Sequence, residues 1–222
     1  MLSPVTQKLP SSSPRDAGFT LIEILVVVGI IGVLAAVLLP QIFGSKLRTT
    51  IVADQANLRW HYQNFVIYEQ GHKKLPAGTG HKFIIEPWVK GDVQRTPKNL
   101  ERYFTPESND PRMEELMAKD PETVWRTPDE LTSGDTSYAG PGPAAKRMPQ
   151  MLTNQKAPLM ANDNEDVPAF ADFTINLLLG ESTVREIKLD ELQALGFDEQ
   201  TEGAKFEVGP ESPHALLKLL ER

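Results

Sequence analysis

The side chain with the clearest chemical signal is Glu23, the single charged residue in an apolar run over residues 19–39. A small residue, Gly18, directly precedes the run, and the carboxylate lies on the fifth residue counted from Phe19. A carboxylate in a membrane-spanning helix costs roughly 2.5–3.5 kcal/mol near the bilayer centre and less toward an end. Glu23 therefore needs either a partner of opposite charge or a place at the interface, where it reaches the headgroups.

The acidic stretch at residues 162–166 is the one candidate metal site in the sequence. Asp163, Glu165 and Asp166 are weak calcium candidates, because calcium prefers several oxygen ligands. An EF-hand loop needs a glycine and a final glutamate where this chain has Val167 and Phe173. A solvated charged loop is the favoured interpretation, and we expect no metal and no cofactor.

No catalytic constellation is visible elsewhere, so an enzyme is not predicted. The four histidines lack metal-ligand spacing, and we expect His61 on a helix surface and His72, His81 and His214 on loops or at a helix end. A Gly-x-Ser-x-Gly nucleophile motif is missing. The chain has no cysteine, which excludes disulfides and thiolate metal sites. Its net charge of -7 argues against nucleic acid as a partner.

The elements that position Glu23 begin with a predicted transmembrane helix over residues 19–39, FTLIEILVVVGIIGVLAAVLL. At 1.5 Å per residue this helix is about 31 Å long, close to the ~30 Å of a hydrocarbon core. A buried helix of a soluble domain is disfavoured because the run is apolar on every face. A cleaved secretory signal is disfavoured because its small residues, Ala35 and Ala36, lie inside the run.

Gly18-Phe19-Thr20-Leu21-Ile22-Glu23 followed by this run closely resembles the N-terminal signature of type IV prepilins and type II secretion pseudopilins. The resemblance implies that a prepilin peptidase removes a leader, residues 1–18, by cutting between Gly18 and Phe19, and then N-methylates Phe19. It implies that Glu23 serves in assembly and that Pro40 loosens the helix. It covers about the first fifty residues, and the leader is longer than the shortest pilin leaders.

The resemblance also sets an orientation that the charges leave open. Lys8 and Arg15 precede the run and Lys46, Arg48 and Arg59 follow it, which leans slightly against a cytoplasmic N-terminus. The family instead implies a single pass through the inner membrane, with the N-terminus cytoplasmic and the C-terminal domain outside. The implied partners are the prepilin peptidase, other pilin or pseudopilin subunits, the inner membrane, and the secretion or pilus assembly machinery.

After Pro40 the sequence predicts an amphipathic continuation of the helix over residues 40–71, then an extracytoplasmic globular domain over residues 72–222. Apolar residues recur at helical spacing, with polar residues such as Asp54 between them; they are Leu47, Ile51, Leu58, Tyr62 and Phe65. The expected fold class is α+β and pilin-like: a long N-terminal helix, transmembrane in its first half, packed on a small antiparallel sheet with loop insertions.

Local patterns predict further elements of this domain. A capping residue before proline predicts three helix starts: Thr96-Pro97, Asp110-Pro111 and Ser212-Pro213. Apolar runs predict a strand at 83–89, broken by Pro87, and a hairpin formed by residues 173–179 and 183–189. Residues 190–195 before Gly196 predict a short helix, and the proline-rich residues 134–168 predict an extended loop.

These features predict a structural subunit of a filament rooted in the inner membrane, in a type II secretion-like or type IV pilus system. Two alternatives remain: a membrane-tethered extracytoplasmic binding module that does not polymerise, and an anchored enzyme. Residues 176–185 faintly resemble a C-terminal hairpin of pilin-like proteins that carry His, nine residues, then Asp-Gly. The matching positions here are Ala171, Glu181 and Ser182, so no function follows from that likeness.

Overall fold

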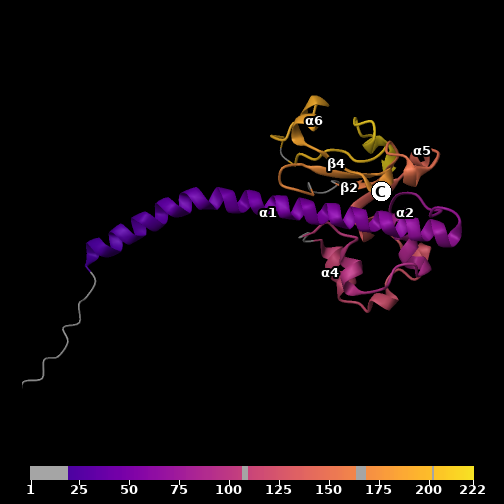
Figure 1. The fold of residues 1–222 in the computed structure, drawn as a ribbon, viewed down its shortest axis with the longest axis horizontal. Helices are drawn as coiled ribbons and strands as arrows, with labels where there is room; N and C mark the ends of the chain where they lie inside the picture. The colour runs from indigo at the N-terminus through magenta and orange to yellow at the C-terminus, as the bar shows by residue number, and fades with distance from the viewer. Residues whose placement is uncertain (1–19, 107–109, 164–168, 202) are drawn as a thin grey trace, which may run out of the picture. The chain divides into compact units, whose positions relative to one another are not determined.

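A computed structural model describes residues 20–106, 110–163, 169–201 and 203–222, apart from the side chains of residues 40–44 (Figure 1). The chain divides into two compact units, Met1–Gly44 and Ser45–Arg222. Helix α1 (Leu21–His72) contributes to both of them. In the first unit its apolar side chains are exposed on every face, and Leu21–Leu39 is long and apolar enough to cross a membrane.

The second unit contains a five-stranded antiparallel sheet with the strand order β4-β3-β2-β1-β5. Its strands are β1 (Tyr138–Pro141), β2 (Pro158–Asn162), β3 (Ile175–Leu179), β4 (Val184–Ile187) and β5 (Leu220–Glu221). The α-helices that follow α1 are α2 (Gly80–Lys90), α3 (Pro97–Glu101), α4 (Pro111–Met117), α5 (Pro143–Lys146) and α6 (Leu189–Ala194). Short 3-10 helices lie at Pro121–Thr123, Pro128–Glu130, Ser133–Asp135, Met151–Thr153, Gly180–Ser182 and Leu217–Leu219.

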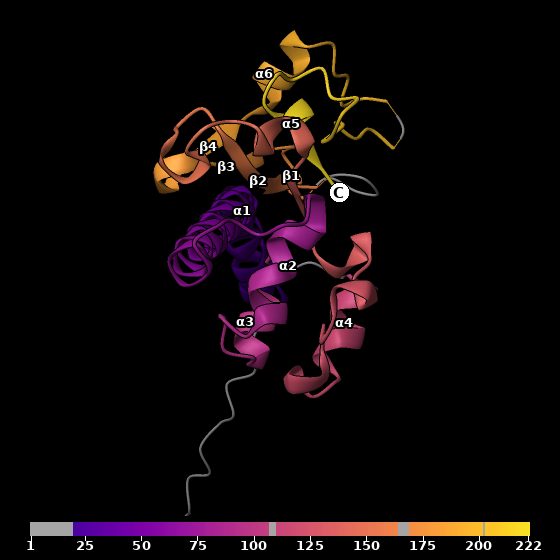
Figure 2. The same ribbon diagram turned by 90° about the vertical axis from the view of Figure 1, so that its right-hand side faces the viewer.

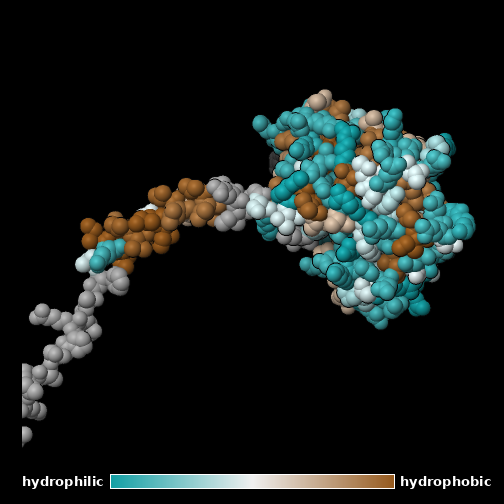
Figure 3. Space-filling view, in the orientation of Figure 1, coloured by the Kyte–Doolittle hydropathy of each residue, from teal (hydrophilic) through white to brown (hydrophobic). Residues whose placement is uncertain are grey.

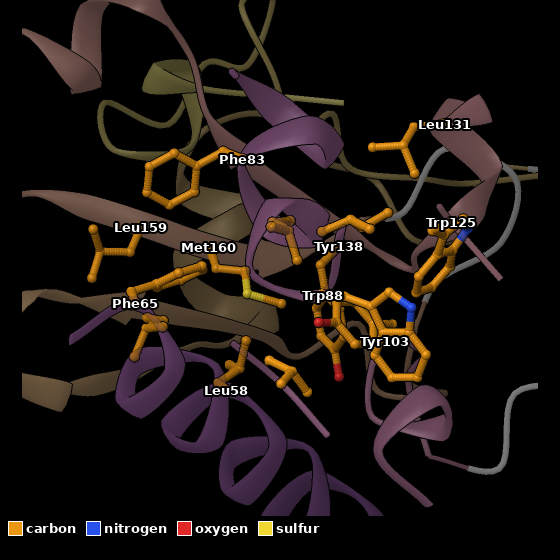
Figure 4. Packing of buried hydrophobic residues seen from close by; sticks show 14 of the residues in the cluster. Leu58, Phe65, Phe83, Trp88, Tyr103, Trp125, Leu131, Tyr138, Leu159 and Met160 are labelled. Atoms are coloured by element: carbon orange, nitrogen blue, oxygen red, sulfur yellow. The ribbon is translucent and has the colours of Figure 1, made fainter. Parts of the chain in front are cut away.

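Two hydrophobic clusters cover the two faces of the sheet. Helices α1 and α2 lie on one side of the sheet and α6 lies on the other (Figure 2). On one face, Leu58 and Phe65 of α1 and Phe83 and Trp88 of α2 pack in the same cluster as Met160 of β2 (Figure 4). The other cluster lies between the sheet and the C-terminal segments, and it contains Ala161, Ile175, Leu177, Leu192, Phe206 and Leu217. The alternation of neighbouring strand residues between the clusters follows from the two-residue period of a strand. The α+β class is thus confirmed.

Several local predictions are confirmed. The Thr96 side chain caps α3 by accepting a hydrogen bond from the Asn99 N–H, and Asp110 caps α4 through the Arg112 N–H. Strands β3 and β4 form the predicted antiparallel hairpin. Helix α6 matches the predicted short helix at residues 190–195.

The predicted strand at 83–89 is wrong, because these residues form α2. The helix ends at Gly91, whose left-handed backbone (φ 80°) accepts the turn without the clash of a Cβ. Phe83, Ile84 and Ile85 are consecutive and all buried, so this part of the helix shows a short continuous apolar run. A short run of that kind does not distinguish a buried helix from a buried strand.

The predicted extended loop at 134–168 is also wrong, since it contains β1, α5 and β2. Three of its prolines lie where the lost N–H is harmless: Pro143 begins α5, Pro158 begins β2 and Pro141 ends β1. The helix predicted after Ser212-Pro213 is reduced to a 3-10 turn, because the chain then forms β5 and pairs Leu220 with Pro141.

Candidate functional site

Helix α1 begins with a reciprocal hydrogen-bond pair between Thr20 and Glu23. Glu23 Oε2 accepts the Thr20 backbone N–H and the Thr20 hydroxyl, each at 2.7 Å, while the Glu23 N–H donates to Thr20 Oγ1 at 3.3 Å. This is the arrangement of a capping box, in which two otherwise free N–H groups at a helix start are satisfied. Since hydrocarbon offers no hydrogen bonds, an uncapped helix end in that environment costs several kcal/mol.

Glu23 therefore has a role within its own chain, which is to cap the start of α1. A carboxylate in the first turn also interacts favourably with the helix dipole. The sequence pattern Thr-x-x-Glu before an apolar run could have revealed this task, because it is the sequence form of the capping box. Assembly remains a predicted role of Glu23, additional to the capping that the structure shows.

Several predicted site residues lie outside the described residues. Gly18 and Phe19, at the predicted cut, are among them, and so are Glu165 and Asp166 of the acidic stretch. Pro40 falls within α1, in the stretch whose side chains are not described. The predicted cut, the methylation and the effect of Pro40 therefore remain predictions.

The remaining calcium candidate, Asp163, is engaged by an arginine. Its Oδ2 lies 2.9 Å from Nε of Arg222, and its side chain is 7% exposed. Across the described parts of the chain, no group of three His, Asp or Glu side chains is placed to hold a metal ion. The described part of the acidic stretch thus forms an ion pair.

The prediction for His61 is wrong, because its side chain is buried. Its Nε2 donates to the carbonyl oxygen of Arg102 at 3.0 Å, and the ring packs edge-on against Trp60, Tyr103 and Tyr138. Burial lowers the pKa of His61 to about 4, so the ring is neutral at pH 7. The sequence signal was its spacing, three residues after Leu58, which places both on one face of a helix.

A buried carboxylate, Asp54, joins α1 to three strands. Its Oδ1 accepts the hydroxyl of Tyr138 in β1 at 2.6 Å, while Oδ2 accepts the amides of Asn162 in β2 (3.1 Å) and Asn176 in β3 (2.7 Å). All four side chains belong to residues that are 0% exposed. Burial raises the pKa of Asp54 to about 6, and hydrogen bonds from Tyr138, Asn176 and Asn162 oppose the rise. We call these four residues the Asp54 cluster.

A polar chain connects the Asp54 cluster to the surface. Gln55 Nε2 donates to Asn176 Oδ1 at 3.3 Å and to Glu186 Oε1 at 2.6 Å, and Arg48 pairs with the same Glu186 oxygen at 2.7 Å. The cluster is closed to a substrate, so its task is to fix the register of α1 against the sheet. Sequence analysis missed it, although Asp54 is spaced between Ile51 and Leu58 for the buried face of the helix.

Asp54 and His61 should act on stability in opposite directions as the pH changes. The pKa of His61 falls on folding, so its stabilising contribution is present above pH 6.5 and is lost as the pH falls toward about 4. The pKa of Asp54 rises on folding, so its contribution is present below pH 3.8 and is lost as the pH rises through about 6. Each contribution is about 3 kcal/mol, and between pH 4 and pH 6 the two largely cancel.

Asp54→Asn removes the pH-dependent contribution of Asp54 to stability and leaves that of His61. Between pH 6.5 and pH 4 we expect the variant to lose about 3 kcal/mol more unfolding free energy than the unaltered chain loses. His61→Gln, which keeps an N–H donor for the Arg102 carbonyl, should instead gain stability as the pH falls through 6. Denaturant unfolding at several pH values measures this, and parallel profiles for all three chains would contradict it.

Comparison with known proteins bears on the N-terminal segment. Residues 13–39 match the family model described as the prokaryotic N-terminal methylation motif. Comparison with curated protein sequences and with solved structures gave no match. The matched residues end where the apolar part of α1 ends, at residue 39.

Proposed function

We propose, from the premise that residues 13–39 carry the N-terminal motif of the prepilin and pseudopilin family, that this chain is a structural subunit of a filament rooted in the inner membrane. The observation that carries the proposal is this motif at the start of an apolar helix whose first turn is closed by Thr20 and Glu23. A second observation supports it: the unit Ser45–Arg222 has hydrophobic clusters of its own, as a head on an anchor requires.

The proposed assembly places the anchors of neighbouring subunits together and the heads outside the cytoplasm. The N-terminus lies in the cytoplasm, where a prepilin peptidase cuts after Gly18 and methylates Phe19. Pro40 loosens α1 between anchor and head, since a proline in a helix removes one backbone hydrogen bond. Without cysteine the chain cannot form the disulfide-closed loop of some pilins, which favours a pseudopilin of a type II secretion-like system.

Processing is the first test. In cells that contain the peptidase, the membrane-extracted chain should begin at methylated Phe19 and contain 222 − 18 = 204 residues. Gly18→Leu should remain full length, because a bulky side chain then occupies the position before the cut. Intact mass spectrometry distinguishes the two products.

The same experiment separates the alternative function. A membrane-tethered binding module that does not polymerise has no need of the peptidase and would keep residues 1–18. An intact leader in peptidase-containing cells would therefore refute the filament proposal and favour the tethered module.

A further inference from the structure

One face of α1 in the head is left uncovered by the described residues, and we call it the α1 stripe. It consists of Val52, Ala56, Arg59, Gln63 and Ile67, which recur every three or four residues. Val52 is 48% exposed and Ile67 is 50% exposed. Figure 3 shows hydrophobic patches interrupting the polar surface of the head along the course of α1. The other faces of this part of α1 pack against the sheet and α2 through residues such as Leu58, Phe65 and Tyr68.

The residue types of the α1 stripe are more typical of a surface that binds a partner than of a surface that faces solvent. Val and Ile are poorer helix formers than Ala, Lys or Glu, so neither propensity nor solvation favours them on an exposed helical face. They lie about 22 Å apart along the helix, with Arg59 midway. The stripe contains no carboxylate although the whole chain has a net charge of -7. No hydrogen bond or ion pair of the Arg59 side chain occurs among the described residues.

A complementary surface lies on the opposite side of the sheet, at the end of α6. Leu195, in the turn that ends α6, is 39% exposed. Exposed Asp190 and Asp198 lie close to it in sequence, and residues 189–204 contain no Lys or Arg. We call Asp190, Leu195 and Asp198 the acidic knob. Among the described residues of the head, the other exposed large apolar side chain is Met117, which stands among mixed charges, with Lys119 paired to Glu115 and Arg112 nearby.

We infer that the α1 stripe of one copy binds the acidic knob of the next copy. The apolar side chains would cover each other while Arg59 meets Asp190 or Asp198. Because the two surfaces differ, such a contact is heterologous, and repeated heterologous contacts generate an open helical array rather than a closed dimer. The inference rests on the proposed filament function and names the head contact within it.

Charge reversal tests the contact in the full chain, expressed with its assembly machinery. Arg59→Glu places like charges against each other, which disfavours the contact. We expect sheared filament per processed subunit to fall at least tenfold. Arg147→Glu is the matched control, because Arg147 is also exposed and also lacks a side-chain ion pair among the described residues; it should assemble normally. Adding Asp190→Arg and Asp198→Arg to Arg59→Glu should restore most of the yield.

Cysteine cross-linking gives an independent readout, since the chain has no cysteine of its own. Copies with Gln63→Cys and copies with Leu195→Cys, expressed together and oxidised, should form a disulfide-linked dimer. Arg147→Cys with Leu195→Cys should not. A disulfide requires Cα atoms within about 7 Å, so the product reports direct contact.

The outcomes separate this contact from the filament itself. Normal filaments from Arg59→Glu, or a defect that the knob reversals leave unrepaired, would overturn the contact and leave the filament proposal standing. No filaments from the processed, unaltered chain would overturn both.

Discussion

Glu23→Gln should be inserted and cleaved normally and yet enter filaments at least tenfold less than the unaltered chain. The proposed cleavage would leave an α-amine on Phe19 with a reference pKa of about 7.7–8.0, so much of it would be cationic at neutral pH. A cation in a low-dielectric region is costly unless it is paired. We propose that Glu23 of one subunit pairs with the amine of its neighbour, which removes both costs and sets the axial register.

Because Glu23 also forms the capping box, its substitution by glutamine tests the role of its charge more specifically than substitution by alanine does. Glutamine at the third helical position can still accept the Thr20 N–H, so Glu23→Gln removes the charge and retains the cap. Glu23→Ala removes both. A Glu23→Gln defect as severe as that of Glu23→Ala assigns the effect to charge. If only Glu23→Ala loses filaments, capping is the sole task of Glu23 and the pairing hypothesis fails. Counting sheared filaments against processed membrane subunit measures both variants.

Asp54→Ala should lower the free energy of unfolding of the head by roughly 3–5 kcal/mol, because three buried donors lose the acceptor that they share. These are the Tyr138 hydroxyl and the amides of Asn162 and Asn176. Asp54→Asn should change the unfolding free energy at pH 7.5 by less than about 1 kcal/mol. Its oxygen can accept both amides, and the Tyr138 hydroxyl can turn toward the Phe104 carbonyl oxygen, 3.4 Å away. Asparagine also lacks the charge whose burial raises the pKa of Asp54.

Tryptophan fluorescence measures this in the detergent-solubilised full chain, since Trp60, Trp88 and Trp125 all belong to the unit Ser45–Arg222. Denaturant unfolding then reports on the head rather than on the anchor. Equal midpoints for Asp54→Ala and Asp54→Asn would show that the three donors find other partners. The cluster would then not hold α1 to the sheet.

The Asp54 cluster also fixes the position of α1 relative to the sheet. Each of the three hydrogen bonds to Asp54 joins α1 to a different strand, so a slip of the helix by one turn would break all three. We infer that the cluster keeps the head in one register on α1, whatever contacts the head makes outside.

The sequence by itself determined the features that depend on neighbours along the chain. The apolar run, the capping residues before Pro97 and Pro111, and the hairpin at residues 173–189 each follow from local chemistry, and the structure contains all of them. The motif match at residues 13–39 rests on the same local information. The capping box of Thr20 and Glu23 was also readable, because it requires only two residues three positions apart.

Only the tertiary structure decided the features in which distant segments meet. Residues 83–89 form a helix that the sequence did not reveal, because neighbouring segments bury most of their side chains and so remove the polar face that marks a surface helix. Asp54 and His61 became buried because strands and loops from residues 102–176 close over α1. The α1 stripe stays exposed because, within the described parts of the chain, no such segment covers it. Burial depends on contacts between residues far apart in the chain, and no local pattern contains that information.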